Sequence, residues 1–281
     1  MRHGIILTTF TDDPRELADA AAEAEAAGWD GVFTWDAISI GEGTPIHDPW
    51  LTMAAIAMRT ERVRIGAILT PPSRRRPWKL ARETMTLDRL SKGRLVLPVG
   101  LGTLDDSAFG NVREPTEART RAEMLDESLE ILIGLWSGEP YSHQGRHYRF
   151  GPMTFRPTPV QRPRIPIWVA AAWPRERSMR RAIRWDGMLV QVHDESGKGR
   201  EVTPNDVRAI AEHAGRERAA AALDGSWEIV VGGSTPADDS AAAAAEARRW
   251  ADAGATWRLE SDWSAPSLDA VRRRITAGPP A

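Results

Sequence analysis

Eight short apolar runs alternate with eight stretches of helical spacing along this chain. Each run is apolar and short enough for a strand buried on both faces, whereas the stretches between them repeat apolar residues at three- and four-residue intervals. Eightfold strand–helix alternation is the pattern of a (β/α)8 barrel, also called a TIM barrel. An open, doubly wound α/β sheet is the alternative. The predicted strands are Gly4–Thr9, Gly31–Trp35, Val63–Thr70, Arg94–Val99, Ile165–Ala170, Gly187–Val192, Trp227–Gly232 and Ala255–Glu260.

The ends of the helical stretches support this alternation. The stretch after the second strand spaces Leu51, Ala54, Ala55 and Met58 at i, i+3, i+4 and i+7, which predicts a helix there. Three helices are predicted to begin with a capping residue followed by a proline, at Asp13-Pro14, Asp48-Pro49 and Thr203-Pro204.

The stretch from Thr84 to Gly102 combines the end of a helix, a stop signal and the fourth strand. Lys92-Gly93 supplies the basic last turn and the left-handed cap that end the helix. Gly100-Leu101-Gly102 then leaves the carboxyl end of the strand almost without side chains. Ligands of α/β barrels bind at this end of the strands, so we expect a flat ligand to approach the backbone closely here.

The composition excludes several classes of function. The formal net charge of −2 gives no reason to expect a nucleic acid or an anionic membrane as a partner. The chain has no cysteine, which excludes disulfides and thiolate chemistry. No apolar run is long enough to span a membrane and no signal peptide precedes the first strand, so we expect a soluble, cytoplasmic protein. Lysine occurs only at positions 79, 92 and 198, so arginine supplies most of the positive charge and arginine clusters are weak evidence of function.

We expect residues 1–281 to form a single domain, because α/β barrels of about 250 residues run as one unit. The segment 138–164, between the fourth helix and the fifth strand, is predicted to be irregular and holds five prolines. It connects a helix to a strand, so it is predicted to cover the barrel face opposite the active one. His143 and His147 lie in it four residues apart, but Gly145 between them argues against a helix, so no metal site is predicted.

The loops that leave the strand carboxyl ends form the active face of such a barrel. They contain none of the motifs of serine hydrolases, P-loop proteins or dinucleotide-binding folds, and no set of His, Asp and Glu has convincing metal spacing. An apolar, glycine-rich mouth that is poor in acid–base residues is typical of proteins that leave the chemistry to an organic cofactor.

Several short segments, in their order along the chain, resemble the bacterial luciferase-like flavin oxidoreductases. They are Asp48-Pro49-Trp50, Thr60 to Gly66, Arg76-Pro77, Leu90 to Arg94, Gly134-Leu135-Trp136 and Pro166 to Val169, and the resemblance extends from Gly4 to about Gly278. It implies a (β/α)8 barrel that carries a reduced flavin, either FMN or a deazaflavin (coenzyme F420), across the strand carboxyl ends. It also implies a small-molecule substrate, a homodimer formed through helices near the second and third strands, and a separate flavin reductase as a candidate partner.

The resemblance also indicates where the cofactor lies. A non-proline cis peptide bond often ends the third strand in this family, and by position it would join Ile68 and Leu69; the alternative is an ordinary trans strand end. Arg175 is the implied charge partner of the cofactor phosphate. The implied cofactor-binding residues are Thr8, Ala67, Ile68, Thr70, Gly100, Leu101, Gly102, Thr103, Ala171, Ala172, Trp173, Arg175 and Gln191.

Two further loops are candidates for the phosphate. Arg74-Arg75-Arg76 follows the third strand, although a solvated loop is the preferred interpretation of these arginines. Gly232 to Thr235 follows the seventh strand, where many barrels bind phosphate; the alternative is that Thr235-Pro236 begins a helix.

The chain departs from the family pattern at two positions. Leu101 stands where luciferase has an arginine, which weakens the phosphate grip there. Ala37 stands where family members commonly carry a histidine beside an acid, whereas the acid is retained as Asp36. His47, in the same loop, and His193, after the sixth strand, are then the candidate proton carriers. Together with Asp36 they are the candidate catalytic residues, with a packing or exposed role as the alternative for both histidines.

Our leading hypothesis is an oxidoreductase of monooxygenase type that uses reduced FMN. Hydride transfer with the deazaflavin is the second hypothesis, and the missing histidine and the short candidate lids (Gly100–Arg113 and Ser39–His47) favour it somewhat. A third hypothesis is a flavin-binding protein without turnover, and a fourth is a cofactor-free hydrolase or isomerase built on Asp36 with Asp105 or Asp106. The candidate aromatic wall, with rim packing as its alternative, consists of Phe10, Phe109, Trp173 and Trp263.

Overall fold

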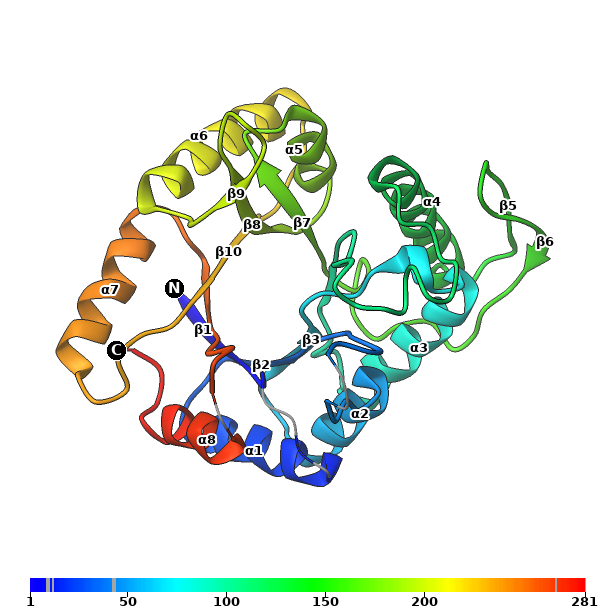
Figure 1. Cartoon of the computed structure of the whole chain (residues 1–281). Helices are drawn as coiled ribbons and strands as arrows, with labels where there is room; N and C mark the ends of the chain where they lie inside the picture. The colour runs from blue at the N-terminus through cyan, green and yellow to red at the C-terminus, as the bar shows by residue number, and fades with distance from the viewer. Residues whose placement is uncertain (9–10, 12, 42–43, 266, 281) are drawn as a thin grey trace.

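Eight parallel strands close into a barrel that is surrounded by helices (Figure 1). The computed structural model describes residues 1–8, 11, 13–41, 44–265 and 267–280. Hydrogen-bonded neighbours around the barrel follow the order β3-β2-β1-β11-β10-β8-β7-β4. The bridges Ile65–Leu95 and Thr70–Val99 then join β3 to β4 and close the ring. The predicted (β/α)8 barrel is confirmed, and the alternative of an open sheet is excluded.

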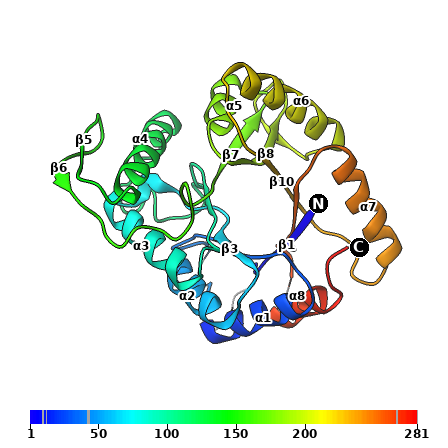
Figure 2. The same ribbon diagram turned by 180° about the vertical axis from the view of Figure 1, so that it is seen from behind.

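The bounds of most elements lie within a few residues of the predicted ones. The barrel strands are β1 (Arg2–Ile6), β2 (Gly31–Thr34), β3 (Arg64–Ala67), β4 (Leu97–Val99), β7 (Ile167–Trp173), β8 (Gly187–His193), β10 (Glu228–Gly233) and β11 (Trp257–Glu260). The helices are α1 (Pro14–Ala26), α2 (Pro49–Arg59), α3 (Pro77–Leu90), α4 (Ala118–Trp136), α5 (Glu176–Ile183), α6 (Pro204–Ala220), α7 (Ser240–Asp252) and α8 (Leu268–Thr276), and Figure 2 shows the same ring from behind. A 3-10 turn, η1 (Pro72–Arg74), follows β3, and β9 (Gly199–Arg200) pairs antiparallel with β8. Thr9 of the first predicted strand and Phe10 of the predicted wall lie outside the described residues.

The strand β7 is longer than predicted. Ala171, Ala172 and Trp173 lie in this strand and pair with residues 190–192 of β8, whereas the sequence placed them in the following loop. The small alanine side chains therefore sit on the barrel wall itself, at its carboxyl end.

Arg94 is a buried arginine that joins the carboxyl end of α2 to the chain before β4. Its Nε donates to the carbonyl of Ser91 at 2.7 Å, and its Nη1 donates to Thr60 Oγ1 at 2.8 Å and to the carbonyl of Val63 at 3.0 Å. Its Nη2 donates to the carbonyls of Ala57 at 2.9 Å and Thr60 at 2.8 Å. β4 begins after this residue, so the prediction that Arg94 opens the fourth strand is wrong. The Arg94 side chain instead binds the free carbonyl groups at the carboxyl end of α2.

Aromatic side chains fill the barrel interior. Phe33, Trp168 and Trp257 pack with ring centroids 5.4 to 6.0 Å apart. Glycines leave room for these rings: a Cβ added to Gly31 would lie 2.8 Å from the Phe33 ring, and one added to Gly187 would lie 2.8 Å from Trp168. A larger second core lies between the strands and the helices. The barrel is therefore a packed core, and a ligand has to lie above these three rings.

The helix α2 is confirmed, but its apolar stripe faces outward. Trp50, Met53 and Ile56 are buried against the barrel, whereas Leu51 is 75% exposed and Met58 is 71% exposed. The sequence pattern is apolar on both sides of this helix, so it predicts the helix without telling which side is covered. The exposed side is an apolar patch that needs an explanation.

The segment 138–164 is not irregular throughout. It contains an antiparallel hairpin of β5 (Tyr141–Gln144) and β6 (Arg149–Met153), which lies outside α3 and α4 at the edge of the ring in Figure 1. Trp78 of α3 packs edge-on against Tyr148 and Phe150, at 6.3 and 5.9 Å between ring centroids. The hairpin thus covers two helices instead of the barrel bottom, because its aromatic side chains pair with the outer face of α3.

Only the second half of this segment reaches the amino ends of the strands. The backbone N–H groups of Val160 and Gln161 donate to the carboxylate of Asp88 at 2.6 and 3.1 Å, and Gln161 Nε2 donates to the carbonyl of Leu95 at 2.7 Å. His143 and His147 point toward Glu127 and Glu123 of α4 respectively. Among the residues that the structure describes, no group of three or more His, Cys, Asp or Glu side chains could hold a metal ion, and no helix is long and apolar enough to cross a membrane.

Candidate active site

The carboxyl ends of the strands form a shallow mouth lined by small side chains. Following the alternation of β7 and β8 upward from the inward-facing Trp168 and Leu189 places Ala170, Ala172 and Gln191 on the inner wall. Ala170 is half-buried, and Gln191 and Gly232 are exposed. A Cβ on Gly232 would meet no atom within 4 Å, so the space above β10 is open. The side of the mouth at β10 therefore has room for a flat ring system, whereas the Leu69 side chain covers Gly100 at the end of β4.

The peptide bond between Ile68 and Leu69 at the end of β3 is cis, as predicted. Both side chains pack with the inner aromatic cluster. Ile68 donates its N–H to the carbonyl of Thr34 at 2.7 Å, and Thr70 donates to the carbonyl of Pro98 at 2.9 Å. Thr70 Oγ1 is buried and has no hydrogen-bond partner among the described residues, and Ala67 is buried in β3. This edge of the mouth is therefore apolar, and Thr70 Oγ1 is a polar atom there that could bind a ligand.

Asp36 is enclosed by two arginines. Its carboxylate accepts hydrogen bonds from Arg74 Nη2 at 2.9 Å and from Arg75 Nη2 at 2.7 and 2.8 Å, and the side chains of Asp36 and Arg74 are at most 2% exposed. The preferred interpretation of Arg74-Arg75-Arg76 as a solvated loop is wrong for Arg74 and Arg75, because buried carboxylates from two neighbouring loops neutralise them, whereas Arg76 is exposed. Asp36 therefore fixes the loop at the end of β2 through these ion pairs. Arg74 and Arg75 already bind carboxylates, so they are poor candidates for the cofactor phosphate.

Asp106 connects the loops after β2 and β4. Its carboxylate pairs with Arg74 and accepts the N–H groups of Ile38 at 2.9 Å and Ser39 at 3.0 Å. Burial by itself raises the pKa of this carboxyl, but the hydrogen bonds from Arg74 and from the N–H groups of Ile38, Ala108 and Ser39 outweigh it and hold the pKa below its ordinary value. Ser107 also donates its N–H to the carbonyl of Ser39 at 2.9 Å. The two candidate lids are thus tied to each other, and Asp36 and Asp106 are no free pair of carboxylates for hydrolysis.

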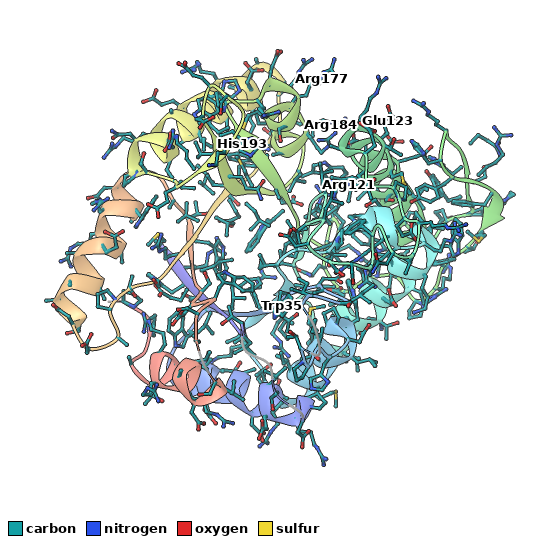
Figure 3. The ribbon with its side chains drawn as sticks, viewed as in Figure 1. Trp35, Arg121, Glu123, Arg177, Arg184 and His193 are labelled. Carbon is teal, nitrogen blue, oxygen red and sulfur yellow. The ribbon has the colours of Figure 1, made fainter. Side chains whose placement is uncertain are left out.

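Arg121 of α4 is a site-supporting residue that the sequence reasoning missed (Figure 3). Its Nη1 donates to the carbonyls of Leu101 at 2.8 Å and Gly102 at 2.9 Å, so it holds the glycine-rich end of β4. The guanidinium groups of Arg74 and Arg121 each lie 5.3 Å from the centroid of the Phe109 ring, which is 1% exposed. Phe109 is therefore an interior anchor of its loop and not a wall of the mouth. No sequence signal could single out Arg121, because arginine is abundant everywhere in this chain.

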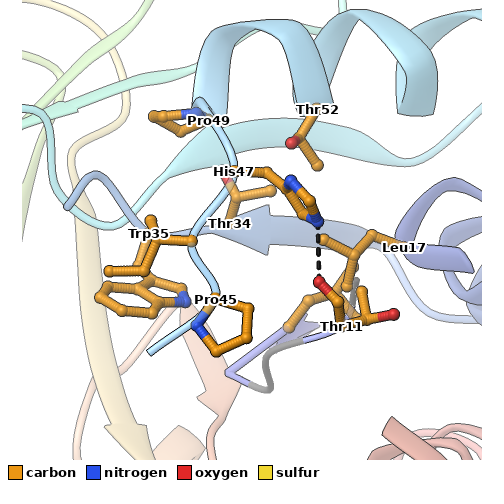
Figure 4. A pocket seen from close by; sticks show the side chains of 10 residues that line it. Thr11, Leu17, Thr34, Trp35, Pro45, His47, Pro49 and Thr52 are labelled. Carbon is orange, nitrogen blue, oxygen red and sulfur yellow. Dashed lines mark hydrogen bonds between the residues drawn. The ribbon is translucent and has the colours of Figure 1, made fainter. Parts of the chain in front are cut away.

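The two candidate proton carriers lie apart. His47 Nε2 is 2.8 Å from the carbonyl oxygen of Thr11, in a small pocket lined also by Thr34 and Trp35 (Figure 4). This pocket opens between β2 and the helices α1 and α2, because Leu17, Pro49 and Thr52 complete its wall. His193 ends β8 on the same face as Gln191, and Figure 3 shows it across the barrel mouth from Trp35. His193 Nδ1 is buried without a hydrogen-bond partner among the described residues.

The residues predicted to bind the cofactor phosphate differ in the hydrogen bonds that they already make within the protein. Arg175 precedes α5 and is exposed, and its Nη2 donates to the carbonyl of Gly197 at 3.1 Å. Thr103 is exposed beside Asp105. At the end of β10, Thr235 donates its N–H and Oγ1 to the buried carboxylate of Glu260 at 2.8 and 3.0 Å. Thr235-Pro236 does not begin a helix, since α7 is capped by Asp239. Thr8 donates to the carbonyl of Asp262 at 2.7 Å and lines the wall next to Glu260.

A closed barrel with a cis bond at the end of its third strand agrees with the family resemblance of the sequence. The model of the luciferase-like monooxygenase family matches residues 1–278. The chain belongs to the luciferase-like monooxygenase family.

Similar proteins differ in the activity that their names state. An F420-dependent glucose-6-phosphate dehydrogenase of Microbacterium testaceum is 35% identical over 180 residues, which are 62% of this chain and 52% of that protein. The chain thus spans about half the length of this curated relative. The crystal structure of a monooxygenase from Streptomyces bottropensis is 27% identical, with a TM-score of 0.72, over 90% of this chain and 78% of that one. An F420-dependent secondary alcohol dehydrogenase, in complex with an F420-acetone adduct, shares the fold with a TM-score of 0.80 at 16% identity, over 98% of this chain and 97% of that one.

Proposed function

We propose that this luciferase-like protein is a hydride-transfer oxidoreductase that binds the deazaflavin coenzyme F420 across its barrel mouth. The observation that carries the proposal is the mouth of small residues, Ala170, Ala172 and Gly232, above a closed aromatic floor. The relative in Microbacterium testaceum, whose name states this cofactor, supports the choice. When bound, the deazaflavin supplies a ring carbon that accepts or donates hydride and does not activate oxygen.

The chain's own residues would hold and orient the cofactor. Ile68 and Leu69 offer an apolar back wall to the ring, and the exposed amide of Gln191 offers a donor and an acceptor at its edge. Arg175 offers an exposed guanidinium to the phosphate of the tail. The donor set fits the group, because the wall is flat where a ring would lie and cationic where a phosphate would lie.

His193 is our candidate for proton transfer. Its imidazole stands at the mouth, and its buried Nδ1 is unpaired among the described residues, so the ring is not committed to a structural hydrogen bond through that atom. His47 is bonded to Thr11 on the helix side of β2, which places it away from the mouth. General acid–base catalysis is worth about 10²- to 10⁴-fold, so we expect His193→Asn to lower kcat by about 100-fold while cofactor affinity stays within twofold. His47→Asn is the matched control and should leave kcat near the wild-type value.

Reduced FMN is the second candidate, with a monooxygenase reaction. The Streptomyces bottropensis monooxygenase supports the reaction type alone, because it is more than one quarter identical over 90% of this chain. In that case a separate flavin reductase would supply the reduced flavin. Titration of the purified protein with coenzyme F420 and with FMN, followed by absorbance and fluorescence, decides between them. Micromolar binding of F420 alone supports our proposal, tighter binding of FMN with oxygen consumption supports the second, and binding of neither refutes both. Binding without turnover would indicate a flavin-binding protein.

We also propose that the protein is a homodimer that pairs through α2. The outer face of this helix carries Leu51 and Met58, exposed by 75% and 71%, with the half-buried Ala54 and Ala55 between them. A stripe of this kind is self-complementary across a twofold axis, because the same apolar residues meet from both subunits. Sedimentation of the wild-type chain tests the proposal, and a monomer at micromolar concentration would refute it.

A further inference from the structure

Large apolar side chains stand exposed on the cofactor side of the barrel. Ile38, in the loop after β2, is 58% exposed, Leu104, after β4, is 50% exposed, and Trp263, after β11, is 60% exposed. We call these three residues the apolar rim. Exposed apolar side chains that gather at one site mark a binding surface more often than scattered ones do. The rim lies at the ends of the strands that form the mouth.

The loops that carry the apolar rim are connected. The ring of Trp263 meets that of Trp35 edge-on at 5.9 Å between centroids, and Trp35 leads directly into the loop of Ile38. The N–H of Ile38 donates to Asp106, which lies two residues after Leu104. The rim therefore runs from the end of β11 past β2 to β4, along one side of the mouth.

The charges next to Leu104 and Trp263 are unfavourable for an anionic substrate. Arg74 and Arg75 are neutralised by Asp36 and Asp106, and Arg121 is buried against backbone carbonyls. Asp105 and Asp262 are exposed carboxylates in the same loops as Leu104 and Trp263. The exposed Arg175 lies after β7 and is the group we assign to the cofactor phosphate. A phosphate on the substrate would thus meet carboxylates beside the rim.

From this arrangement we infer that the substrate is an uncharged molecule with an apolar body, and not a sugar phosphate. The inference rests on the proposed function, because it places the substrate between the cofactor and the apolar rim. Apolar surface of a ligand that becomes buried against the large side chains of the rim favours binding. A phosphate that loses water beside two carboxylates opposes binding. The relative named as a glucose-6-phosphate dehydrogenase would then differ from this chain in what it accepts.

Binding of two probes to the cofactor-loaded protein tests the inference. We expect 2-octanone, followed by saturation-transfer NMR, to bind at least tenfold more tightly than glucose 6-phosphate. Trp263→Ser and Ile38→Ser should each weaken 2-octanone binding by about tenfold, since each removes a large apolar side chain. Val160→Ser is the matched control, because Val160 is also exposed, by 46%, at the opposite end of the barrel. Glucose 6-phosphate binding equal to or tighter than 2-octanone would overturn the inference.

Two further outcomes distinguish failure of the inference from failure of the proposed function. If neither F420 nor FMN binds, the proposed function fails; if a cofactor binds but 2-octanone does not respond to Trp263→Ser, only the inference fails. A protein partner or a second copy is the other occupant that an apolar rim could have. Sedimentation of Ile38→Ser detects it: a change in oligomeric state with unchanged 2-octanone binding would identify the rim as a protein interface and overturn the inference.

Discussion

Replacement of Arg74 by glutamine tests the idea that one buried guanidinium holds the loops of the mouth in place. Arg74 pairs with Asp36 from the loop after β2 and with Asp106 from the loop after β4. All three side chains are at most 2% exposed. The substitution removes the positive charge but keeps a side chain of related shape and some hydrogen-bonding capacity.

The magnitude follows from what each carboxylate retains. Removing one partner of a buried ion pair costs about 3–5 kcal/mol. Asp36 still has Arg75, and Asp106 still has the N–H groups of Ile38, Ser39 and Ala108. We therefore expect the lower end, about 3 kcal/mol in the free energy of unfolding. Arg75→Gln is the matched control, because Arg75 is 16% exposed, pairs with Asp36 alone among the described carboxylates and leaves Asp36 paired with Arg74, so it should cost less than Arg74→Gln.

Urea denaturation followed by tryptophan fluorescence measures both losses at neutral pH. Hydrogen exchange adds a local readout, since the amides of Ile38 and Ser39 donate to Asp106 and should exchange faster in Arg74→Gln than in Arg75→Gln. A loss below 1 kcal/mol for Arg74→Gln, or equal losses for both variants, would refute the reasoning that the bridge between the two loops carries this stability.

Three further predictions concern other parts of the chain. The hydrogen bond from Arg200 first, and those from Thr203 next, outweigh burial and lower the pKa of Asp206 to about 2. This stabilisation is fully present above the ordinary pKa and is lost as the pH falls through 2; Asp206→Asn should therefore cost about 1–2 kcal/mol in urea melts at pH 7 and progressively less between pH 4 and pH 2. Arg94→Lys should cost about 2–3 kcal/mol in thermal denaturation, because an ammonium cannot reproduce the five hydrogen bonds of the guanidinium; an unchanged melting temperature contradicts this. Leu51→Glu with Met58→Glu should convert a dimer to monomers in sedimentation, whereas Val160→Glu should not; a dimer that survives the double substitution excludes α2 as its interface.

The barrel could be predicted from the sequence because its signals are local. A strand buried on both faces needs a continuous apolar run, and the runs here alternate with helical stretches, three of which begin with a capping residue and a proline. The order of the elements can therefore be predicted without any long-range information. The family pattern added the cis bond after Ile68, which no local propensity indicates. Family-level knowledge and local pattern together were sufficient for the scaffold, and the side of the barrel on which the site lies stays a prediction.

The parts that were predicted wrongly depend on partners distant in the sequence. Arg74 resembles any other arginine of an arginine-rich chain until the fold brings Asp36 and Asp106, 38 and 32 residues away, to it. The same holds for Arg94, whose acceptors lie mostly in α2 and the turn after it, and for Arg121. The hairpin of β5 and β6 was missed because its aromatic side chains pack on α3 and not on a sheet. Buried ion pairs and the packing of the hairpin on α3 depend on contacts between residues that are distant in the sequence, and a single sequence does not show these contacts.

The aromatic filling of the barrel has a consequence for how such a site can change. Phe33, Trp168 and Trp257 occupy the volume in which the side chains of non-glycine residues at nearby strand positions would lie. The size of each ring therefore depends on the absence of a side chain at a neighbouring position. Enlarging one member requires shrinking another: Gly31→Ala alone would press a methyl group into the Phe33 ring, whereas Gly31→Ala with Phe33→Leu exchanges volume across two positions on one strand. A substitution that deepened the site by removing one of these rings would therefore also destabilise the barrel. Changes in the chemistry of such a site are expected in the loops at the strand ends, while the aromatic floor stays the same.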